Sequence, residues 1–247
     1  MFDKKAYSFK TVDADGEDKS VSLVGLPRES DWILYASYSD KSLMRNHLAY
    51  GLSNKIGRYA PRTRFVELFL KDSQSPVEES YVGVYVLVES IKRGKDRVDF
   101  SRLKKDSGGQ MSGGYILKWD RVDGPETYFT SELGTVLGFV SPRGDRLDDE
   151  QRAFIKSDFS RVERVLAGRD FLDPQNGYAQ FVDKDSFIDF FLLNELFKNV
   201  DAYFLSTFLH KQDDGKLHLG PVWDLDLSSG NASYGGVWNA EGWMLFP

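Results

Sequence analysis

The stretch Gly220-Pro-Val-Trp-Asp-Leu-Asp-Leu-Ser-Ser-Gly230 says most about the fold and chemistry of this chain. This stretch places Asp224 and Asp226 two residues apart, after an apolar run and before a turn of small residues. On a strand, residues i and i+2 point to the same side, so both carboxylates would converge on one point. Such a pair repels unless a cation lies between its members, and hard cations such as Mg²⁺ prefer oxygen ligands. The pattern indicates either a metal site or two turn-capping Asp residues beside a buried Trp223.

The residues before this stretch predict a β-hairpin. Two short strands, at 203–211 and 217–222, are joined by Asp213-Asp-Gly215, a typical hairpin turn. Asp201 precedes the first strand and Asp224 follows the second, so the open end of the hairpin should bring them together. Clustering of buried negative charge is costly. Three carboxylates at one end of a rigid element therefore favour a functional site over an accident.

Composition narrows the class of protein. The chain has 247 residues, 41% hydrophobic and 14% aromatic, enough for one large domain or two lobes. A net charge of −6 argues against binding to nucleic-acid phosphates, because the basic clusters at 92–95 and 102–105 have acidic neighbours. Cysteine is absent and only three His residues occur, which excludes thiolate chemistry and disfavours a zinc site. No run approaches the roughly 18 apolar residues of a membrane span.

Periodicity predicts an α+β fold with a strand-rich front and a helical back. The expected strands are 6–10, 32–35, 64–70, 81–89, 114–119 and 136–141, with a polar loop around 73–76 and one long helix over 40–56 marked by Met44, Leu48, Leu52 and Ile56. Beyond Pro142, helices should follow Asp148, which forms a capping box with Gln151, and Asp183. We expect a front region at 1–142 and a back region at 143–247 that carries the hairpin. Both ends of the chain are expected to be cuts inside a longer protein.

A helix, an Asp-bearing loop, a hairpin and a metal-binding Asp also follow one another in the core of protein kinases. In that core the first Asp positions or deprotonates the acceptor hydroxyl, and the second holds Mg²⁺ across the nucleotide phosphates. The strand-rich front half resembles a kinase N-lobe, with 81–89 leading into a hinge.

Ordered blocks along nearly the whole chain resemble the CotH-type family of spore-coat kinases. They are Lys4-Lys5-Ala-Tyr7, Trp32-Ile-Leu-Tyr-Ala-Ser-Tyr-Ser-Asp40, Leu43-Met-Arg-Asn46, Ala60-Pro-Arg-Thr-Arg-Phe-Val-Glu-Leu68, Tyr81-Val-Gly-Val-Tyr-Val-Leu-Val-Glu-Ser-Ile-Lys92, Gly113-Gly-Tyr-Ile-Leu117 and Gly220-Pro-Val-Trp-Asp-Leu-Asp226. The resemblance implies an atypical protein kinase with a diverged, two-lobed kinase-like fold. It also implies that ATP and Mg²⁺ or Mn²⁺ are used to phosphorylate Ser or Thr of secreted or spore-coat proteins, in an extracellular or spore-surface setting.

Carried over to this chain, the resemblance makes Asp201 the catalytic Asp and Asp224 the metal-binding Asp, with Asp226 as a second metal contact. Two features depart from familiar kinases. Neither a G-x-G-x-x-G loop nor a G-x-x-x-x-G-K-[ST] loop occurs. The metal-binding Asn that usually lies five residues after the catalytic Asp is replaced by Ser206.

Five further side chains are candidates for contact with the nucleotide or its phosphates: Lys5 on the first strand (with Lys4 as the fallback), Arg64 on a later strand, Glu89 and Lys92 at the proposed hinge, and His218 on the second hairpin strand. Each also has an ordinary structural interpretation. Lys5 can be a solvated strand-edge residue. Glu89 and Lys92 can form an exposed ion pair, and His218 can be a half-exposed strand residue.

The sequence thus predicts first a kinase whose partner is a protein with a Ser or Thr acceptor. Two other functions stay open. One is a catalytically weak or inactive module that keeps the fold, and the nucleotide, without turnover. The other is a metal-dependent phosphohydrolase built on the same carboxylates.

Overall fold

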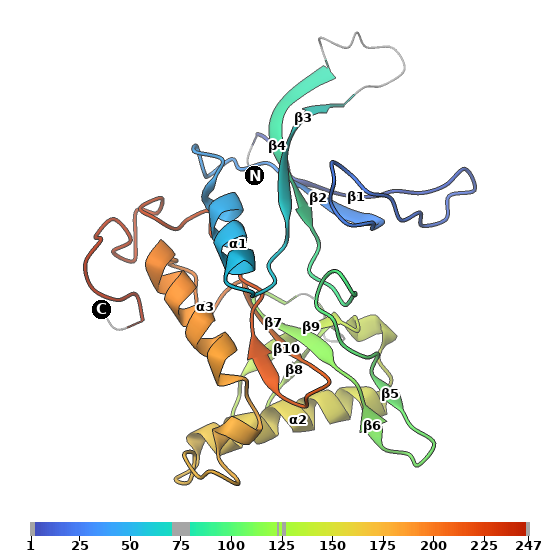
Figure 1. The fold of residues 1–247 in the computed structure, drawn as a ribbon, viewed down its shortest axis with the longest axis vertical. Coiled ribbons are helices and arrows are strands. Elements are labelled where there is room, and N and C mark those ends of the chain that lie inside the picture. The colour runs from blue at the N-terminus through green and yellow to red at the C-terminus, as the bar shows by residue number, and fades with distance from the viewer. Residues whose placement is uncertain (1–2, 71–79, 123, 125–126, 246–247) are drawn as a thin grey trace.

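The structure is a computed structural model that describes residues 3–70, 80–122, 124 and 127–245. Within these residues two larger β-sheets and a small two-stranded sheet are combined with three α-helices (Figure 1). The predicted α+β class is confirmed. The polar loop predicted around 73–76 lies outside the described residues.

The first sheet is antiparallel and has the order β1-β2-β4-β3. Its strands are β1 (Tyr7–Lys10), β2 (Asp31–Tyr35), β3 (Thr63–Phe69) and β4 (Tyr81–Glu89). The second half of β4 is buried on both faces. Val86 and Val88 pack against α1 (Arg45–Lys55) on one face, and Leu87 packs against Leu26 on the other. The four predicted strands of this region are confirmed to within a residue or two.

The second sheet has the order β11-β10-β7-β9-β8. Its strands are β7 (Tyr115–Trp119), β8 (Tyr128–Thr130), β9 (Val136–Ser141), β10 (Thr207–Lys211) and β11 (Leu217–Leu219). Strands from both sides of residue 142 therefore share one sheet, and the division of the chain at that residue stays a prediction. The two-stranded sheet of β5 (Lys104–Lys105) and β6 (Met111–Ser112), like β8, had no expected counterpart.

Three α-helices surround the sheets: α1 (Arg45–Lys55), α2 (Asp149–Ala167) and α3 (Lys184–Phe197). The predicted capping box opens α2, where the Asp148 carboxylate accepts from the backbone N–H of Gln151 at 2.8 Å. This helix runs beneath the five-stranded sheet (Figure 1) and buries Ile155 and Phe159 against it. Short 3₁₀ turns occupy Gly144–Arg146 and Tyr178–Gln180.

Helix α1 begins at Arg45, later than the start of the helix predicted over 40–56, and most of its apolar stripe does not face the core, although Leu52 packs against it. Met44, Leu48 and Ile56 are about half exposed. The buried face instead carries Asn46, Ala49, Tyr50 and Ser53. The reason is that this face holds polar backbone groups of a distant segment, as the next section describes.

The hairpin of β10 and β11 is confirmed, with His210 opposite His218 in its register. Its turn contains Gly215 at a positive φ of 77°, a conformation that glycine adopts without steric cost. Both strands are shorter than expected. The strand predicted to reach Val222 ends at Leu219, because Gly220 takes a φ of 116° and turns the chain away.

Candidate active site

The segment that carries the Asp pair is held in place by α1. The backbone N–H of Asp224 donates to the Tyr50 hydroxyl at 3.0 Å, and that of Leu225 donates to Asn46 Oδ1 at 2.7 Å. Leu225 is fully buried between these contacts and the core. The polar face of α1 thus anchors a segment that lies about 180 residues away in the chain.

The geometry that predicted convergence of the two carboxylates is wrong in detail. Residues 221–225 form no strand, and Asp224 has a φ of 59°, in the left-handed region. For a residue with a Cβ this conformation costs roughly 1–2 kcal/mol. The hydrogen bonds that the N–H groups of Asp224 and Leu225 donate to α1 help to offset this cost. The Asp224 side chain is therefore aimed by anchored backbone and not by strand alternation.

The three predicted carboxylates nevertheless lie close enough to influence one another. Burial raises the pKa of Asp224 to about 6, and the charges of Asp226, Asp201 and Asp120 contribute to this rise. Burial also raises the pKa of Asp201, with the charge of Asp226 as the next cause. The open end of the hairpin is therefore a concentration of negative charge.

Each carboxylate of this cluster has a hydroxyl neighbour. Ser206, which replaces the expected Asn, donates its hydroxyl to Asp224 Oδ2 at 3.3 Å. Tyr35 lies near Asp226 and Tyr234 lies near Asp201, and burial together with the charges of these carboxylates raises the pKa of both phenols. Neutral donors of this kind orient a carboxylate without cancelling its charge.

The loop that presents Asp201 is fixed by buried asparagines at the end of α3. Asn199 Nδ2 donates to Asn194 Oδ1 at 2.8 Å, and the N–H of Asp201 donates to Asn199 Oδ1 at 3.3 Å. Lys198 ends the helix at a φ of 49°. The polar helix end noted in the sequence is thus the support of the Asp201 loop.

A divalent cation suits the donor set of this cluster. Two neighbouring carboxylates, Asp224 and Asp226, supply only oxygen atoms, which Mg²⁺ and Mn²⁺ favour. The raised pKa of Asp224 includes a repulsion that a cation would relieve. Across the described residues, no three His, Asp or Glu side chains are close enough to form a complete cation cage by themselves. A cation held here would need further ligands, which nucleotide phosphates and water supply in kinases.

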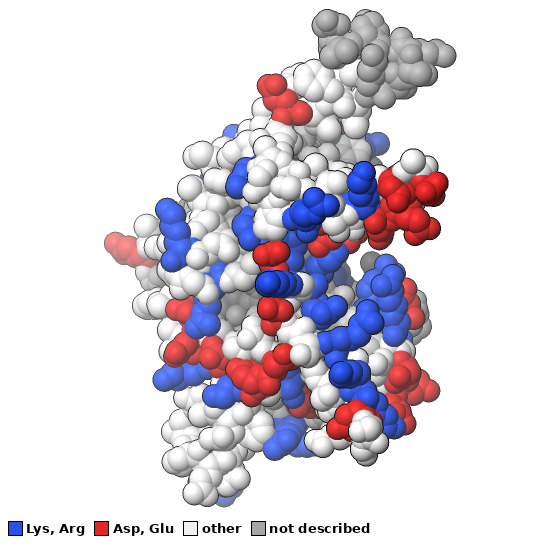
Figure 2. Space-filling model, turned by 45° about the vertical axis from the view of Figure 1, so that its right-hand side comes forward, with Lys and Arg blue, Asp and Glu red and all other residues white. Residues whose placement is uncertain are grey.

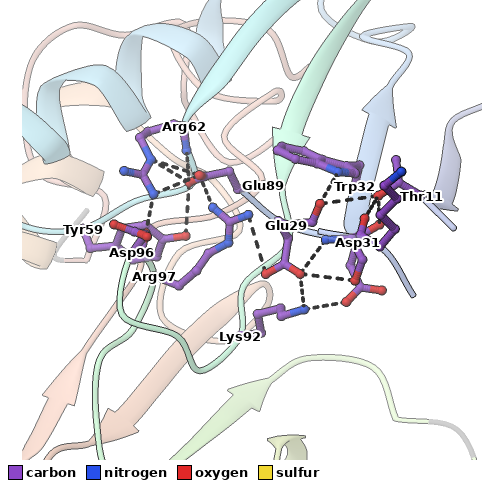
Figure 3. Close-up of polar contacts among 12 residues, drawn as sticks. Thr11, Glu29, Asp31, Trp32, Tyr59, Arg62, Glu89, Lys92, Asp96 and Arg97 are labelled. Carbon is purple, nitrogen blue, oxygen red and sulfur yellow. Dashed lines mark hydrogen bonds and ion pairs between the residues drawn. The ribbon is translucent and has the colours of Figure 1, made fainter. Parts of the chain in front are cut away.

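Glu89 is fully buried and serves a structural network (Figure 3). Its carboxylate forms ion pairs with Arg62, at 2.9 Å, and with Arg97, and it accepts from the Arg62 backbone N–H at 2.9 Å. Because these contacts occupy both oxygens, we assign Glu89 to holding the end of β4. The exposed ion pair with Lys92 expected as the alternative does not form.

Lys92 instead joins two acidic residues at the edge of the first sheet (Figure 3). Its ammonium group lies 2.9 Å from a Glu29 oxygen and 2.5 Å from an Asp31 oxygen. These carboxylates raise the pKa of Lys92, although burial opposes them. The contacts link β2 to the segment after β4.

The basic candidates near the N-terminus lie differently from expectation. Lys5 is exposed and precedes β1, so its assignment to the first strand is wrong. Lys4 donates to the Val84 carbonyl and lies over the Tyr85 ring, 4.4 Å from its centre. Arg64 lies on β3 as predicted, with an exposed side chain that donates to the Val24 carbonyl at 3.2 Å.

His218 is buried on β11 and stacks on His210, with ring centres 5.1 Å apart. Its Nε2 lies 3.2 Å from Asp214, and its Nδ1 lies 3.6 Å from Asp183, the cap of α3. The ring lines a small cavity of about 290 Å³ that also contains Arg58. The half-exposed strand position considered as an alternative is therefore wrong.

Sequence reasoning missed four residues that surround the cluster. They are Tyr35 at the end of β2, Asp120 and Arg121 after β7, and Tyr234 in the C-terminal segment. Asp120 and Arg121 directly follow a strand that pairs with β10, which is a signal that could have placed them near the hairpin. Tyr35 and Tyr234 gave no local signal, since only the tertiary fold brings them to the site.

The fold and site together define a class: an α+β protein in which an Asp-bearing loop, a hairpin and an Asp pair follow one another as in phosphoryl-transfer enzymes. The comparison with protein families then identifies the chain. It belongs to the CotH kinase protein family, whose family model matches residues 1–245. A comparison with curated proteins gave no match. The resemblance drawn from the ordered sequence blocks is confirmed.

Proposed function

We propose that this protein is a protein kinase that uses ATP and Mg²⁺ or Mn²⁺ to phosphorylate Ser or Thr of a protein substrate, within a diverged two-lobed kinase fold. The observation that carries the proposal is the convergence of Asp201 with Asp224 and Asp226 at the open end of the hairpin. Membership in a family named for kinase activity supports it.

In this proposal Asp201 positions the acceptor hydroxyl and accepts its proton. Burial and the charge of Asp226 raise the pKa of Asp201, which makes its carboxylate a better base than that of an exposed Asp. The hydroxyl of Tyr234 lies beside this carboxylate and would help to orient it. The charge of Arg121, which acts on Asp201, stabilises its ionised form.

Asp224 and Asp226 would hold the divalent cation. When bound, such a cation bridges the nucleotide phosphates and neutralises the charge that develops during transfer. Ser206 would orient Asp224 in place of the Asn that familiar kinases use as a second metal ligand. Among the nucleotide candidates, Lys5 and Arg64 have exposed side chains, and we keep both as proposed phosphate contacts.

Of the other three candidates, Glu89 has both carboxylate oxygens engaged by Arg62 and Arg97, so we rank it last. His218 and Lys92 differ in what their contacts allow. His218 stays a proposed contact only from the cavity that its ring lines. Lys92 would have to give up two carboxylate partners to reach a phosphate, so we rank it below Lys5.

An inactive nucleotide-binding module is the second candidate function, and Ser206 is the observation that favours it. A hydroxyl is a weaker cation ligand than the amide oxygen it replaces, and here it is already bonded to Asp224. A phosphohydrolase on the same carboxylates is the third. It would need additional His or carboxylate ligands, and the described residues contain no such set.

The setting of the protein is also a proposal. The family's name suggests association with a spore coat, and we propose an extracellular or spore-surface location. None of the helices in the described part of the chain combines the length and apolar character needed to cross a membrane. Figure 2 shows one face on which basic and acidic side chains are interspersed, in agreement with a protein partner and not nucleic acid.

Transfer from labelled ATP in the presence of Mn²⁺ tests the proposal. We expect wild-type protein to label a mixed protein substrate, and Asp201→Asn and Asp224→Asn each to lower labelling by roughly 10²-fold or more. The exposed Asp185 on α3 supplies the matched control, Asp185→Asn, which should label like wild type. Nucleotide binding without transfer by the wild type would favour the inactive module. Phosphate release without protein labelling would favour the hydrolase.

A further inference from the structure

A groove opens beside Asp201 and runs along the C-terminal segment, residues 234–244. It has a volume of about 1060 Å³, and Asp201 forms part of its wall. Figure 1 shows the C-terminal segment lying next to α3, on the side of the molecule away from β5 and β6. The groove therefore starts at the residue that the proposed function assigns to the acceptor hydroxyl.

The walls of this groove are aromatic and unusually exposed. Phe204, Tyr234, Trp238 and Trp243 line it, and each is at least half exposed, with Trp238 at 65%. Large aromatic side chains gathered in one exposed groove are typical of a surface that binds another molecule. Tyr234 joins the groove to the site, because it lines the groove together with Asp201 and lies close enough for the Asp201 charge to act on its hydroxyl.

The groove offers no free positive charge among its described residues, and its two acidic residues are Asp201 and Glu241. Its one Lys, Lys198, has its ammonium group engaged by the carbonyls of Glu241, at 2.9 Å, and Gly242. The carboxylate of Glu195 on α3 accepts the backbone N–H of Leu245 at 3.0 Å and is buried. These contacts hold the C-terminal segment against α3, so the groove wall has a defined position in the fold.

Glycines shape the part of the wall nearest to Asp201. At Gly235, with a φ of 69°, a Cβ would lie 2.4 Å from the Val200 side chain. Only glycine lets the C-terminal segment approach the Asp201 loop this closely. The close approach is what makes the aromatic wall and the acidic site continuous.

The groove continues onto α3. An adjoining hollow of about 750 Å³ shares Lys198, Trp238 and Trp243 with it. This second hollow is bordered by Leu192 and Leu196, which are 50% and 67% exposed. An apolar path therefore leads from the acidic site to the outer face of α3.

We infer that this groove binds the acceptor segment of the protein substrate and selects segments with apolar or aromatic side chains beside the acceptor Ser or Thr. The inference rests on the proposed function, since it takes Asp201 as the residue that meets the hydroxyl. An extended segment fits because its hydroxyl can meet Asp201 while neighbouring side chains bury against Phe204 and Trp238. Acidic segments gain nothing from this wall, because its Lys is already engaged and its other charged residues, Asp201 and Glu241, are acidic.

Peptide binding tests the inference without requiring catalysis. Two fluorescent peptides of equal length are used, with the central Ser replaced by Ala; one is flanked by Trp, Phe and Leu, and the other by Lys and Glu. We expect fluorescence anisotropy to show that the apolar peptide binds the full chain and that Trp238→Ala and Phe204→Ala each weaken binding about tenfold. Phe69→Ala, which removes a comparably exposed ring at the far end of β3, should bind like wild type.

Equal or tighter binding of the charged peptide would overturn the inference, as would unchanged binding by both groove variants. Phosphorylation of the matching Ser peptides provides the second readout. There Trp238→Ala should raise KM for the apolar peptide about tenfold, with the KM for ATP unaffected. If the wild type transfers no phosphate, or Asp201→Asn transfers as well as wild type, the proposed function fails. The anisotropy result alone then decides whether the groove binds peptides.

Discussion

Single residues in this protein carry opposing demands of stability and chemistry, and Asp224 is the clearest case. It adopts a left-handed backbone conformation, is largely buried, and faces other carboxylates. Each feature is unfavourable for folding. A functional site is the setting in which such strain and charge are commonly retained.

Replacement of Asp224 by Asn should therefore stabilise the metal-free protein. The folded pKa of Asp224 is raised from 3.8 to about 6, so its ionisation destabilises the fold as pH rises through 6. At pH 7.5 we expect Asp224→Asn to increase the free energy of unfolding by roughly 2 kcal/mol. Urea denaturation measures this, with Asp185→Asn as the control that should change little. A less stable Asp224→Asn variant would contradict the assignment of a repulsive cluster.

Glu89 and Lys92 test how burial changes the cost of breaking an ion pair, because Glu89 is fully buried and Lys92 is partly exposed. We expect Glu89→Gln to cost about 3–5 kcal/mol, because the buried Arg97 guanidinium loses its nearer carboxylate partner and keeps only Glu29, at 3.9 Å. Lys92→Met should cost about 0–1 kcal/mol, since that ammonium group is about one-third exposed and solvent screens its pairs. Thermal unfolding of both variants makes the comparison. Equal losses of stability in the two variants would contradict the expectation that a buried ion pair costs more to break than a partly exposed one.

Directly before β7, at Gly114, the backbone passes very close to Lys211, the last residue of β10. A Cβ on Gly114 would lie 2.2 Å from the Lys211 carbonyl oxygen and 2.6 Å from the Phe100 ring. Gly51 is the opposite case, because it lies inside α1, where an added Cβ would point into open space.

We expect Gly114→Ala to destabilise the protein by about 3 kcal/mol, because strand backbone would have to move. Gly51→Ala should stabilise it by about 0.5–1 kcal/mol, since alanine loses less backbone entropy in a helix. The prediction is checked by comparing the denaturation midpoint of each variant with that of wild type. A harmless Gly114→Ala would mean that the β7–β10 approach is looser than the structure has it.

The hairpin carries a histidine that resists protonation. Burial lowers the pKa of His210 to about 4, although its Nδ1 bonds the Gly220 carbonyl at 3.0 Å. The unfolded chain binds this proton near pH 6.5, so stability from the neutral ring is present above 6.5 and is lost as pH falls toward 4.

Wild type should accordingly lose roughly 2–3 kcal/mol more than His210→Gln between about pH 6.5 and 4. Unfolding free energies measured across this range provide the difference curve, in which the shared titration of the carboxylates cancels. His47→Gln reports the effect of removing a histidine elsewhere. Parallel curves for wild type and His210→Gln would contradict the depressed pKa.

At the scale of the whole molecule, α1 connects the front of the chain to the site at its end. Its polar side chains Asn46 and Tyr50 hold the backbone of residues 224 and 225, while its apolar Leu48 faces solvent. The usual rule of apolar inside and polar outside is broken at these positions, although Ala49 and Leu52 of the same helix pack against the core. This arrangement places a rigid support directly behind the acidic cluster.

Asn46→Ala should destabilise the protein by about 1–3 kcal/mol, because it leaves the buried Leu225 N–H without its acceptor. It should also lower phosphoryl transfer, since the Asp224 backbone loses a neighbouring anchor. Leu48→Ala, on the exposed face of the same helix, should change stability by at most about 0.5 kcal/mol. Unfolding and transfer assays on both variants test this arrangement. A larger loss for Leu48→Ala would refute it.

The order of residues along the chain was enough to predict the α+β class, most strands and helices, the hairpin and the family. These features depend on local periodicity, on turn chemistry and on the order of short blocks, all of which can be followed along the chain. The same reasoning singled out Asp201, Asp224 and Asp226, whose catalytic and metal-binding roles stay proposals.

Three features required the three-dimensional structure: which face of α1 is buried, what Glu89 and Lys92 contact, and how Asp224 is aimed. The structure also brought Tyr35, Asp120 and Tyr234 to the cluster. The physical reason is that each of these depends on contacts between segments far apart in the chain. Burial and charge act between groups that are close in space, and no local pattern of residues records them.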